Sequence, residues 1–471
     1  MTTAPARLIV TTDPELDDLN SMLRLLLYSN EIDIAALVYS ASRFHHRGDL
    51  ARAVAANRWP SAGDRMHIDQ AVDAYEAAYD NLVRHDPRYP RPADLRAIIA
   101  EGNIDDAGDT RNPTAGSDLV KAVLLSKAPG RVFAQAWGGT NTIARALMSI
   151  EQEFRDTDRW EEIYGLVVGR TVITSFAEQD DTFADYIRPT WPELEFRDVA
   201  TAAWGYFAWD VVPDDAKHYL TAEWTRDNVS TVGPLGRAYR VWGDGKQMAA
   251  GFDPEDYFGV PGATPESLVA QGYALWAPLR PDGAWISEGD SSNFAMHIDN
   301  GLRNAEHPTF GGWGGRLERD ENDPHRWNSV GQVPWSPGAA VVDAGEVAQW
   351  FGAYQRDFAA RLRWSVTPEF ADANHAPRIL ATQTDISVSP GQRVVLPFAV
   401  EDPDGDDVSV TAWQELDYAC EVEVSPHELI VTIPVDAPEA NIHIIVQATD
   451  SGTPALTGYA RFVLSVHKDA L

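Results

Sequence analysis

The chain has 471 residues, 44% of them hydrophobic, and 71 Asp and Glu against 38 Lys and Arg, which gives a net charge of −33. This length predicts two or three domains with sizeable cores, at roughly 150 residues each. The acidic balance argues against nucleic acid and against an anionic membrane surface as partners, because both need a basic patch. Neutral sugars and cations remain open as ligands.

The cysteine content and the length of the apolar runs exclude further classes of protein. The single cysteine, Cys420, excludes an intrachain disulfide and a Cys-based zinc site. No stretch reaches the ~18 consecutive apolar residues that span a bilayer, and the first six residues lack the basic and apolar regions of a signal peptide. As written, the sequence predicts a cytoplasmic protein, or a secreted one if a leader has been removed.

The first forty residues predict a βαβ unit. An apolar strand is expected over residues 8–12, a helix over 16–29 and a second strand over 32–40. The second strand is almost continuously apolar, which is typical of a parallel strand covered on both faces. The polar loop after it, with His45 and His46, is expected at the same edge as the loop after the first strand.

Three carboxylates follow the first strand. In an open α/β sheet, ligands collect at the carboxyl ends of strands, so Asp13, Asp17 and Asp18 are expected to crowd one pocket mouth. Three like charges there predict a bound cation, and calcium accepts oxygen ligands of this kind. The alternative is that Asp17 and Asp18 only cap the following helix and complement its dipole.

Strands and helices continue to alternate up to about residue 200. The apolar spacing predicts helices over residues 69–84, 94–101, 117–127 and 142–154, and strands over 131–136 and 162–168. This alternation predicts a mainly parallel sheet flanked by helices. Residues 200–365 have no clear pattern except an amphipathic helix over 347–364.

The pattern changes to period two after residue 377. Six stretches are expected to be strands, at residues 393–400, 408–412, 420–424, 429–433, 442–446 and 460–466. Short strands at this spacing predict an antiparallel, immunoglobulin-like β-sandwich. The expected organisation is therefore an α/β domain over residues 1–368, a linker over 369–378 and a sandwich over 379–471.

Several motifs resemble a known family. Asp13-Pro-Glu-Leu-Asp17-Asp18 resembles the Asp-x-Asp-Pro-Gly-x-Asp-Asp opening of the calcium-dependent nucleoside hydrolases, and Trp137-Gly-Gly-Thr140-Asn141 is similar to their second motif. The segments at residues 179–181, 288–290, 311–316 and 358–364 look like the nucleoside-hydrolase-like family described as cellulose-binding, which also carries a C-terminal β-sandwich. The resemblance covers nearly the whole chain and implies this fold.

The resemblance also implies an activity and a metal. It implies a calcium-dependent glycoside hydrolase that cleaves the bond of a furanosyl or related sugar in an oligosaccharide or glycoconjugate, by direct attack of a metal-bound water. Asp13 would ligate calcium and act as general base, with Asp18, the Thr140 carbonyl and Asp290 as further calcium ligands and Glu288 as the fallback for Asp290. Nucleoside hydrolases commonly self-associate, so a homo-oligomer is possible.

Other residues are expected to contact the carbohydrate. By resemblance or by position, these substrate-binding residues are Asp17, Asn141, Gln179, Asp180, Glu288 and Trp313. The alternatives are an Asx-turn at Asp180 and a structural turn around Trp313. The leaving group would be assisted by stacking on Trp137 or Trp313, or by one of His45, His46, Asp180, Glu288 and His297.

The opening also departs from the nucleoside hydrolase motif. Thr11 replaces its first acid and Glu15 replaces its glycine. Because of these two changes, a standard purine or pyrimidine nucleoside is not the expected natural substrate. They also support an alternative function, a non-catalytic protein that binds a cellulose-like glycan on a nucleoside hydrolase scaffold.

Overall fold

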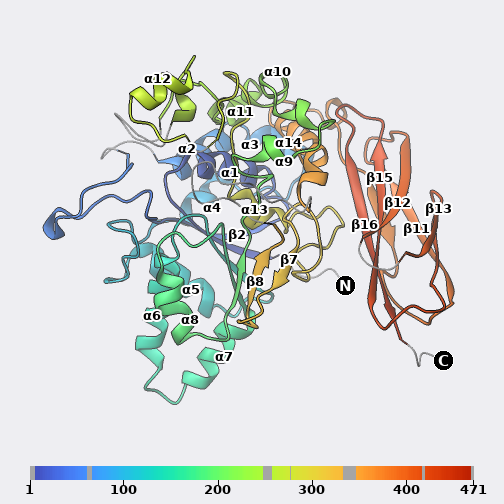
Figure 1. Cartoon of the computed structure of the whole chain (residues 1–471), viewed down its shortest axis with the longest axis horizontal. Coiled ribbons are helices and arrows are strands. Elements are labelled where there is room, and N and C mark those ends of the chain that lie inside the picture. Colours follow the sequence, from blue (N-terminus) through green and yellow to red (C-terminus); the bar gives the residue numbers. More distant parts are fainter. Residues whose placement is uncertain are drawn as a thin grey trace.

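A computed structural model describes residues 6–60, 66–247, 257–275, 277–331, 346–415 and 419–467. Figure 1 shows a large part built from a sheet with helices around it, and a smaller part of strands alone that packs against its side. None of the described helices is long and apolar enough to cross a membrane.

The large part is organised around an eight-stranded sheet with the order β3-β2-β1-β4-β5-β6-β8-β7. Its strands are β1 Arg7–Thr12, β2 Asp33–Tyr39, β3 Ile99–Glu101, β4 Val132–Ala136, β5 Thr171–Ser175, β6 Glu195–Asp198, β7 Leu317–Arg319 and β8 Arg326–Ser329. All neighbouring pairs are parallel except β7 with β8. The prediction of a mainly parallel sheet is confirmed.

Helices cover both faces of this sheet. The longest are α1 Leu16–Leu27, α2 His67–Glu76, α5 Ala115–Leu125, α6 Asn141–Phe154, α7 Trp160–Arg170 and α14 Phe351–Trp364. Along β1, Leu8 and Val10 join the core beneath α1, α2 and α14, whereas Ile9 joins the core beneath α5, α6 and α7. This alternation follows from the period of two in a strand and explains why the central strands are apolar throughout.

Shorter elements fill the rest of the α/β part. They are η1 Leu50–Arg52, α3 Tyr79–His85, α4 Pro92–Ala97, η2 Phe183–Ile187, α8 Arg188–Thr190, α9 Ala208–Val211, η3 Lys217–Leu220, α10 Ala222–Thr225, η4 Arg226–Ser230, α11 Gly233–Ala238, η5 Tyr257–Gly259, α12 Pro265–Ala270, α13 Ser291–Ala295, η6 Ala348–Trp350 and η7 Phe370–Asp372. Most of them lie in residues 200–365, where the sequence shows no long apolar period.

Two predicted elements are wrong, one of them in part. The helix expected over residues 94–101 ends at Ala97, and Ile99–Glu101 form strand β3. Residues 162–168 are part of helix α7 rather than a strand, and the strand is β5 at Thr171–Ser175. Ile163 and Val167 are the buried residues of α7, and their spacing of four is that of a helix face. A short apolar run does not distinguish a strand from a buried helix by itself.

The smaller part is a β-sandwich of two four-stranded sheets, with the orders β10-β16-β15-β12 and β13-β14-β11-β9. Its strands are β9 Arg378–Ala381, β10 Asp385–Val388, β11 Arg393–Glu401, β12 Val408–Glu415, β13 Glu421–Val424, β14 Glu428–Thr432, β15 Asn441–Asp450 and β16 Thr457–Val466. Along β11, buried Val394, Leu396 and Phe398 alternate with exposed residues. All pairs are antiparallel except β10 with β16.

The two parts meet along β16 (Figure 1). Tyr459 N donates to Asn300 O at 2.9 Å and Arg461 N donates to Gly301 O at 3.1 Å. Gly301 has φ +87°, and a Cβ there would lie 1.8 Å from Tyr459 O, so only glycine allows this approach. Tyr459 also belongs to the main core of the α/β part, together with Trp350.

Candidate functional site

The loops after β1, β2 and β4 come together at the carboxyl edge of the large sheet. Asp13 directly follows β1, Ser42 lies in the loop after β2, and Gly138 follows β4. Ser42 Oγ donates to Asp13 Oδ2 at 2.5 Å, and a Cβ on Gly138 would lie 2.4 Å from Asp13 Oδ1. The structure thus brings the two resemblance motifs into contact, and the glycine leaves room for the Asp13 carboxylate.

Asp13 is fully buried and its two oxygens differ. Oδ2 also faces His45 Nδ1 at 3.1 Å, whereas no group among the described residues hydrogen-bonds Oδ1. Burial raises the pKa of Asp13, but the hydrogen bonds and charge of His45 and the bond from Ser42 outweigh it, so the pKa lies below its usual value. Asp13 is therefore an ionised carboxylate with one unused oxygen.

Three further aspartates surround it. Asp290 is the residue before α13, and the Asp18 and Asp290 side chains share a hydrogen bond. Burial and mutual repulsion hold the pKa values of Asp18 and Asp290 well above their usual range, and burial raises that of Asp17 to about 6. Asp290 Oδ1 has no partner among the described residues. The raised pKa values mean that ionising these acids lowers the free energy of unfolding.

Glu15 lies at the partly exposed side of the cluster. Its Oε2 is 3.6 Å from His45 Nδ1, and its side chain is 21% exposed. Tyr206 Oη donates to Glu15 Oε1 and to Asp17 Oδ1, each at a distance of 3.4 Å. We define the carboxyl-edge cluster as Asp13, Glu15, Asp17, Asp18 and Asp290, with His45 beside it.

The cluster fits a cation. Ligand atoms of Asp13, Glu15 and His45 lie within 4.8 Å of one another, as do those of Glu15, Asp17 and Asp18. The unused oxygens of Asp13 and Asp290 are buried, where an uncompensated charge is costly. Carboxylate oxygens of this number are the ligands that calcium accepts.

Two residues behind the cluster have no sequence signal. Thr12 Oγ1 donates to Asp18 Oδ1 and lies 2.9 Å from His67 Nε2. Burial lowers the pKa of His67 to about 3, so this ring is neutral and orients Thr12. His67 opens α2, far from either motif in sequence. Ser42 was also missed, although its loop was expected at this edge.

The Thr140–Asn141 turn is a helix start in which most polar atoms already have partners. Asn141 N donates to Asp180 Oδ2 at 2.8 Å, and the Asn141 amide donates to Asn103 O and accepts from Ser40. The Thr140 carbonyl accepts the first bond of α6, from Ala144 N at 2.9 Å. Asp180 therefore caps α6, and the predicted ligand role of Thr140 and substrate roles of Asn141 and Asp180 stay predictions.

Glu288 forms a buried ion pair. Its carboxylate accepts from Arg24 Nε and Nη2 and from Tyr239 Oη, and both Arg24 and Glu288 side chains are fully buried. The neighbouring residues Ser287 and Gly289 instead face Asp17. The predicted contact of Glu288 with substrate, and its alternative as a metal ligand, would require this pair to open.

Trp313 and Gln179 are also buried. Trp313 is 2% exposed and packs edge-on against Tyr354 in the main core. Gln179 Nε2 donates to Trp137 O at 3.2 Å, while its Oε1 has no partner among the described residues. The predicted substrate contacts of Gln179 and Trp313 both stay predictions.

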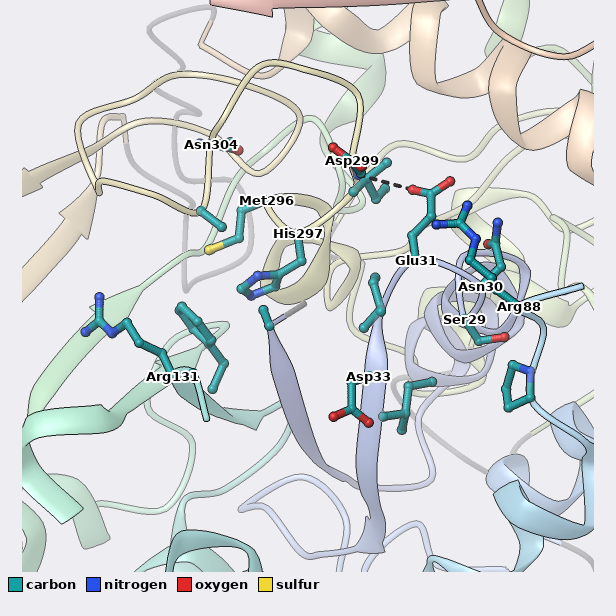
Figure 2. Close-up of a pocket in the computed structure, with 18 of the residues that line it drawn as sticks. Ser29, Asn30, Glu31, Asp33, Arg88, Arg131, Met296, His297, Asp299 and Asn304 are labelled. Carbon is teal, nitrogen blue, oxygen red and sulfur yellow. Dashed lines mark hydrogen bonds between the residues drawn. The ribbon is translucent and has the colours of Figure 1, made fainter. Parts of the chain in front are cut away.

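His297 lies at the opposite edge of the sheet. It lines a groove of about 1360 Å³ together with Asp33, which opens β2, and Arg131, which directly precedes β4. Figure 2 shows these side chains around the amino ends of the strands. A strand of six residues is about 20 Å long, so His297 cannot assist a leaving group at Asp13. His45 is the histidine that the structure places in the cluster.

Comparisons with known proteins agree with this architecture. The family described as "Cellulose-binding Sde182, nucleoside hydrolase-like domain" matches residues 7–317, and "Cellulose-binding protein Sde0182, C-terminal domain" matches residues 394–466. No curated protein matches the chain.

One solved structure with the same fold covers almost the whole chain. A nucleoside hydrolase-related hypothetical protein from Saccharophagus degradans, associated with carbohydrate metabolism, is 21% identical over 98% of this chain and 100% of that chain, with a TM-score of 0.72. A protocadherin gamma C5 fragment is 23% identical over 19% of this chain and 34% of that chain, with a TM-score of only 0.16. With two thirds of its length matched, the chain belongs to the cellulose-binding, nucleoside-hydrolase-like family.

Proposed function

We propose that the carboxyl-edge cluster is a calcium-dependent glycoside hydrolase site that cleaves the bond of a furanosyl or related sugar in an oligosaccharide or glycoconjugate. The observation that carries this proposal is the pair of buried, unpartnered carboxylate oxygens, Asp13 Oδ1 and Asp290 Oδ1. Asp13, Asp18 and Asp290 would hold the cation, with the Thr140 carbonyl as a further ligand. When bound, calcium would orient sugar hydroxyls and acidify a water molecule.

Asp13 is suited to act as the general base. Ser42 and His45 fix Oδ2, so the carboxylate has one orientation and Oδ1 is the atom that takes the proton. Its lowered pKa keeps it ionised at neutral pH. A water deprotonated there attacks from one face of the sugar, which inverts the anomeric centre.

The other acids would stabilise the positive charge that develops on the sugar in the transition state. Glycosidic cleavage has an oxocarbenium-like transition state, and fixed carboxylates stabilise such a cation without reorganisation. Asp17 accepts from Ser287 Oγ at 3.2 Å and from Tyr206, which fixes it as an acceptor for sugar hydroxyls. Glu15 and the adjoining Tyr206 are partly exposed, so a sugar would reach them first.

A second candidate function is carbohydrate binding without turnover. The observation that favours it is the burial of Asp13, Asp18 and Asp290, at 0%, 1% and 3% exposure, because a sugar carbon must approach Asp13 for hydrolysis. The family description, cellulose-binding, is equally consistent with it. A glycan held at Glu15 and Tyr206 would then never reach the base.

A substrate panel separates these functions. The chelated protein would be incubated with nucleosides, furanosides and cello-oligosaccharides, with and without added calcium, and sugar release would be measured. We expect calcium-dependent release that Asp13→Asn lowers by about 10²–10⁴, the usual contribution of a general base. Asp33→Asn, at the amino end of β2, is the matched control and should retain activity.

The outcomes are distinct. Full activity after exhaustive chelation would refute the calcium requirement. Calorimetric binding of a glycan with no release by the wild type, over long incubation, would replace hydrolysis by the binding function. Proton NMR of the first product anomer tests the inversion.

A further inference from the structure

The groove at the amino ends of the strands lies opposite the carboxyl-edge cluster and takes no part in the proposed function. We call it the amino-edge groove. Its walls come from residues 29–34, 88–98, 129–133 and 296–306, and Figure 2 shows side chains from all four segments. Its volume of about 1360 Å³ exceeds the roughly 300–1,000 Å³ of most small-molecule pockets. The groove therefore has room for an extended ligand.

One wall of the groove is held in place by the sandwich. Gly301 O accepts from Arg461 N of β16 at 3.1 Å, and Arg303 Nη2 lies 3.0 Å from Asp385 Oδ2 in β10. These contacts fix the loop that carries His297. A wall that is already ordered loses little conformational entropy when a ligand binds, and this favours affinity.

His297 is an unsatisfied polar side chain in this groove. It is only 9% exposed, and neither ring nitrogen has a hydrogen-bond partner in the part of the chain that the structure describes. The ring packs edge-on against Phe133, with 4.3 Å between the centroids, and in Figure 2 it points from the end of α13 toward the amino ends of the strands.

The His297 ring is neutral. Burial and the charges of Arg197 and Arg131 lower the pKa of His297 to about 3. At neutral pH the ring therefore carries one N–H donor and one acceptor nitrogen. A buried donor or acceptor without a partner destabilises the folded chain, so a molecule in the groove that satisfies both nitrogens would gain affinity from them.

Most charged residues of the groove already have a partner of opposite charge. Their ion pairs, all at 2.6–2.8 Å, are Arg131–Glu195, Arg303–Glu306, Arg88–Asp86, Asp94–Arg91 and Asp33–Arg7. An ionic ligand would have to compete with these pairs, whereas a neutral ligand leaves them intact. The groove thus differs in charge from the carboxyl-edge cluster and favours a neutral, polar ligand.

We propose that the amino-edge groove binds a segment of a neutral glycan chain, with His297 as the residue that hydrogen-bonds its hydroxyl groups. A hydroxyl group both donates and accepts hydrogen bonds, which matches the single donor and single acceptor of a neutral imidazole. Apolar side chains, among them Ile34, Ile98 and Pro129, line the same groove and would contact the C–H faces of sugar rings. This site is independent of the carboxyl-edge cluster and of hydrolysis.

Titration calorimetry of the full chain with cellohexaose, in excess chelator, tests the proposal. We expect the wild type to bind without calcium. His297→Leu, which removes both ring nitrogens, should weaken binding about tenfold, the loss of one or two net hydrogen bonds. His297→Gln keeps a donor and an acceptor and should retain most of the affinity.

Two further variants serve as controls for position. His427→Leu removes an exposed histidine of the sandwich and should leave the affinity for cellohexaose unchanged. Asp17→Asn changes the opposite edge of the sheet and should also leave it unchanged. An oligogalacturonate of the same length carries a negative charge on each ring and should bind more weakly than cellohexaose.

Stability and NMR separate a ligand contact from a structural role. Because the His297 nitrogens lack partners in the free chain, His297→Leu should unfold at a higher denaturant concentration than the wild type. In protein labelled with ¹⁵N-histidine, the His297 signal is the one missing from His297→Leu. It should shift when cellohexaose is added.

Each contrary result overturns the proposal. No binding of cellohexaose by the wild type, or equal affinity in His297→Leu, would mean that only water occupies the groove. Equal losses in His297→Gln and His297→Leu, or a lower unfolding midpoint in His297→Leu, would assign His297 a packing role. A loss in Asp17→Asn alone would place the glycan at the carboxyl-edge cluster. Tighter binding of the oligogalacturonate would refute the neutral class. Hydrolysis is measured separately, so its absence would refute only the proposed function.

Discussion

The contact along β16 between the α/β domain and the sandwich, which we call the seam, and the carboxyl-edge cluster both bury charged side chains. Only at the seam are these side chains paired with side chains of opposite charge. At the seam, Arg461 donates to Glu415, and Arg316 lies 2.7 Å from Glu415 and 3.0 Å from Glu346. Two positive and two negative charges cancel there. The cluster gathers five carboxylates around one histidine. Balanced buried charge joins the domains, whereas unbalanced buried charge marks a ligand site.

Breaking the seam should have the largest effect. Glu415→Gln leaves the fully buried Arg461 without its carboxylate, and we expect a loss of about 3–5 kcal/mol in the free energy of unfolding. Denaturant titration measures it. Asp94→Asn removes an exposed partner of Arg91 and should change nothing measurable. Equal stability of both variants would refute the distinction between the two regions.

The cluster should instead make the metal-free protein less stable as the pH rises. Asp17 keeps its proton to a pKa of about 6 in the folded chain but only to 3.8 when unfolded. Folding therefore takes up a proton between these values, and raising the pH from 4 to 7 removes about 2–3 kcal/mol of stability.

Asp17→Asn provides the reference for this pH effect. After chelation, the unfolding free energy of Asp17→Asn relative to the wild type should rise by that amount over the same pH range. Added calcium should diminish the difference in the wild type. Parallel stability curves at every pH would show that the Asp17 charge is already compensated.

Filling the space beside Asp13 should have an intermediate effect. In Gly138→Ala the new Cβ would lie 2.4 Å from Asp13 Oδ1 and displace the carboxylate, so we expect calcium binding to weaken about tenfold, or about 1.4 kcal/mol. Titration calorimetry measures this. Gly165→Ala in α7 meets no atom within 4 Å and should stabilise the helix by about 0.5–1 kcal/mol, with calcium binding unchanged.

The smallest effect is expected at the mouth of the cluster. Tyr206→Phe removes two hydrogen bonds of 3.4 Å, to Glu15 and Asp17. Bonds of this length are weak, so sugar affinity should fall by about 0.5 kcal/mol, roughly twofold to threefold. A loss of tenfold or more would show that Tyr206 contacts the sugar directly.

Local patterns predicted most of the scaffold. Apolar runs and loop order placed β1, β2 and β4 and brought Asp13 to the glycine turn, because parallel strands end at one edge. The helix at residues 160–170 was misread because its apolar stretch is short. The strands β7 and β8 lie in a region without long periods, and only tertiary pairing reveals them.

Side-chain partners were not predictable in the same way. Glu288 reads as one more acid near Asp290, but its pairing with Arg24 spans 264 residues. His67 orients Thr12 across 55 residues, and no local pattern encodes such a contact. His297 follows a helix close to Asp290 in sequence, yet the chain carries it to the opposite edge of the sheet.

The seam along β16 also determines how the molecule moves. Residues 369–372, in the predicted linker, are exposed, but the domains are joined by the strand-like bonds of Tyr459 and Arg461 and by a shared core. We therefore expect a protease cut in the linker to leave both fragments associated, with the sedimentation coefficient and rotational correlation time of the intact chain. The sandwich would then stay at a fixed distance and angle from the carboxyl-edge cluster.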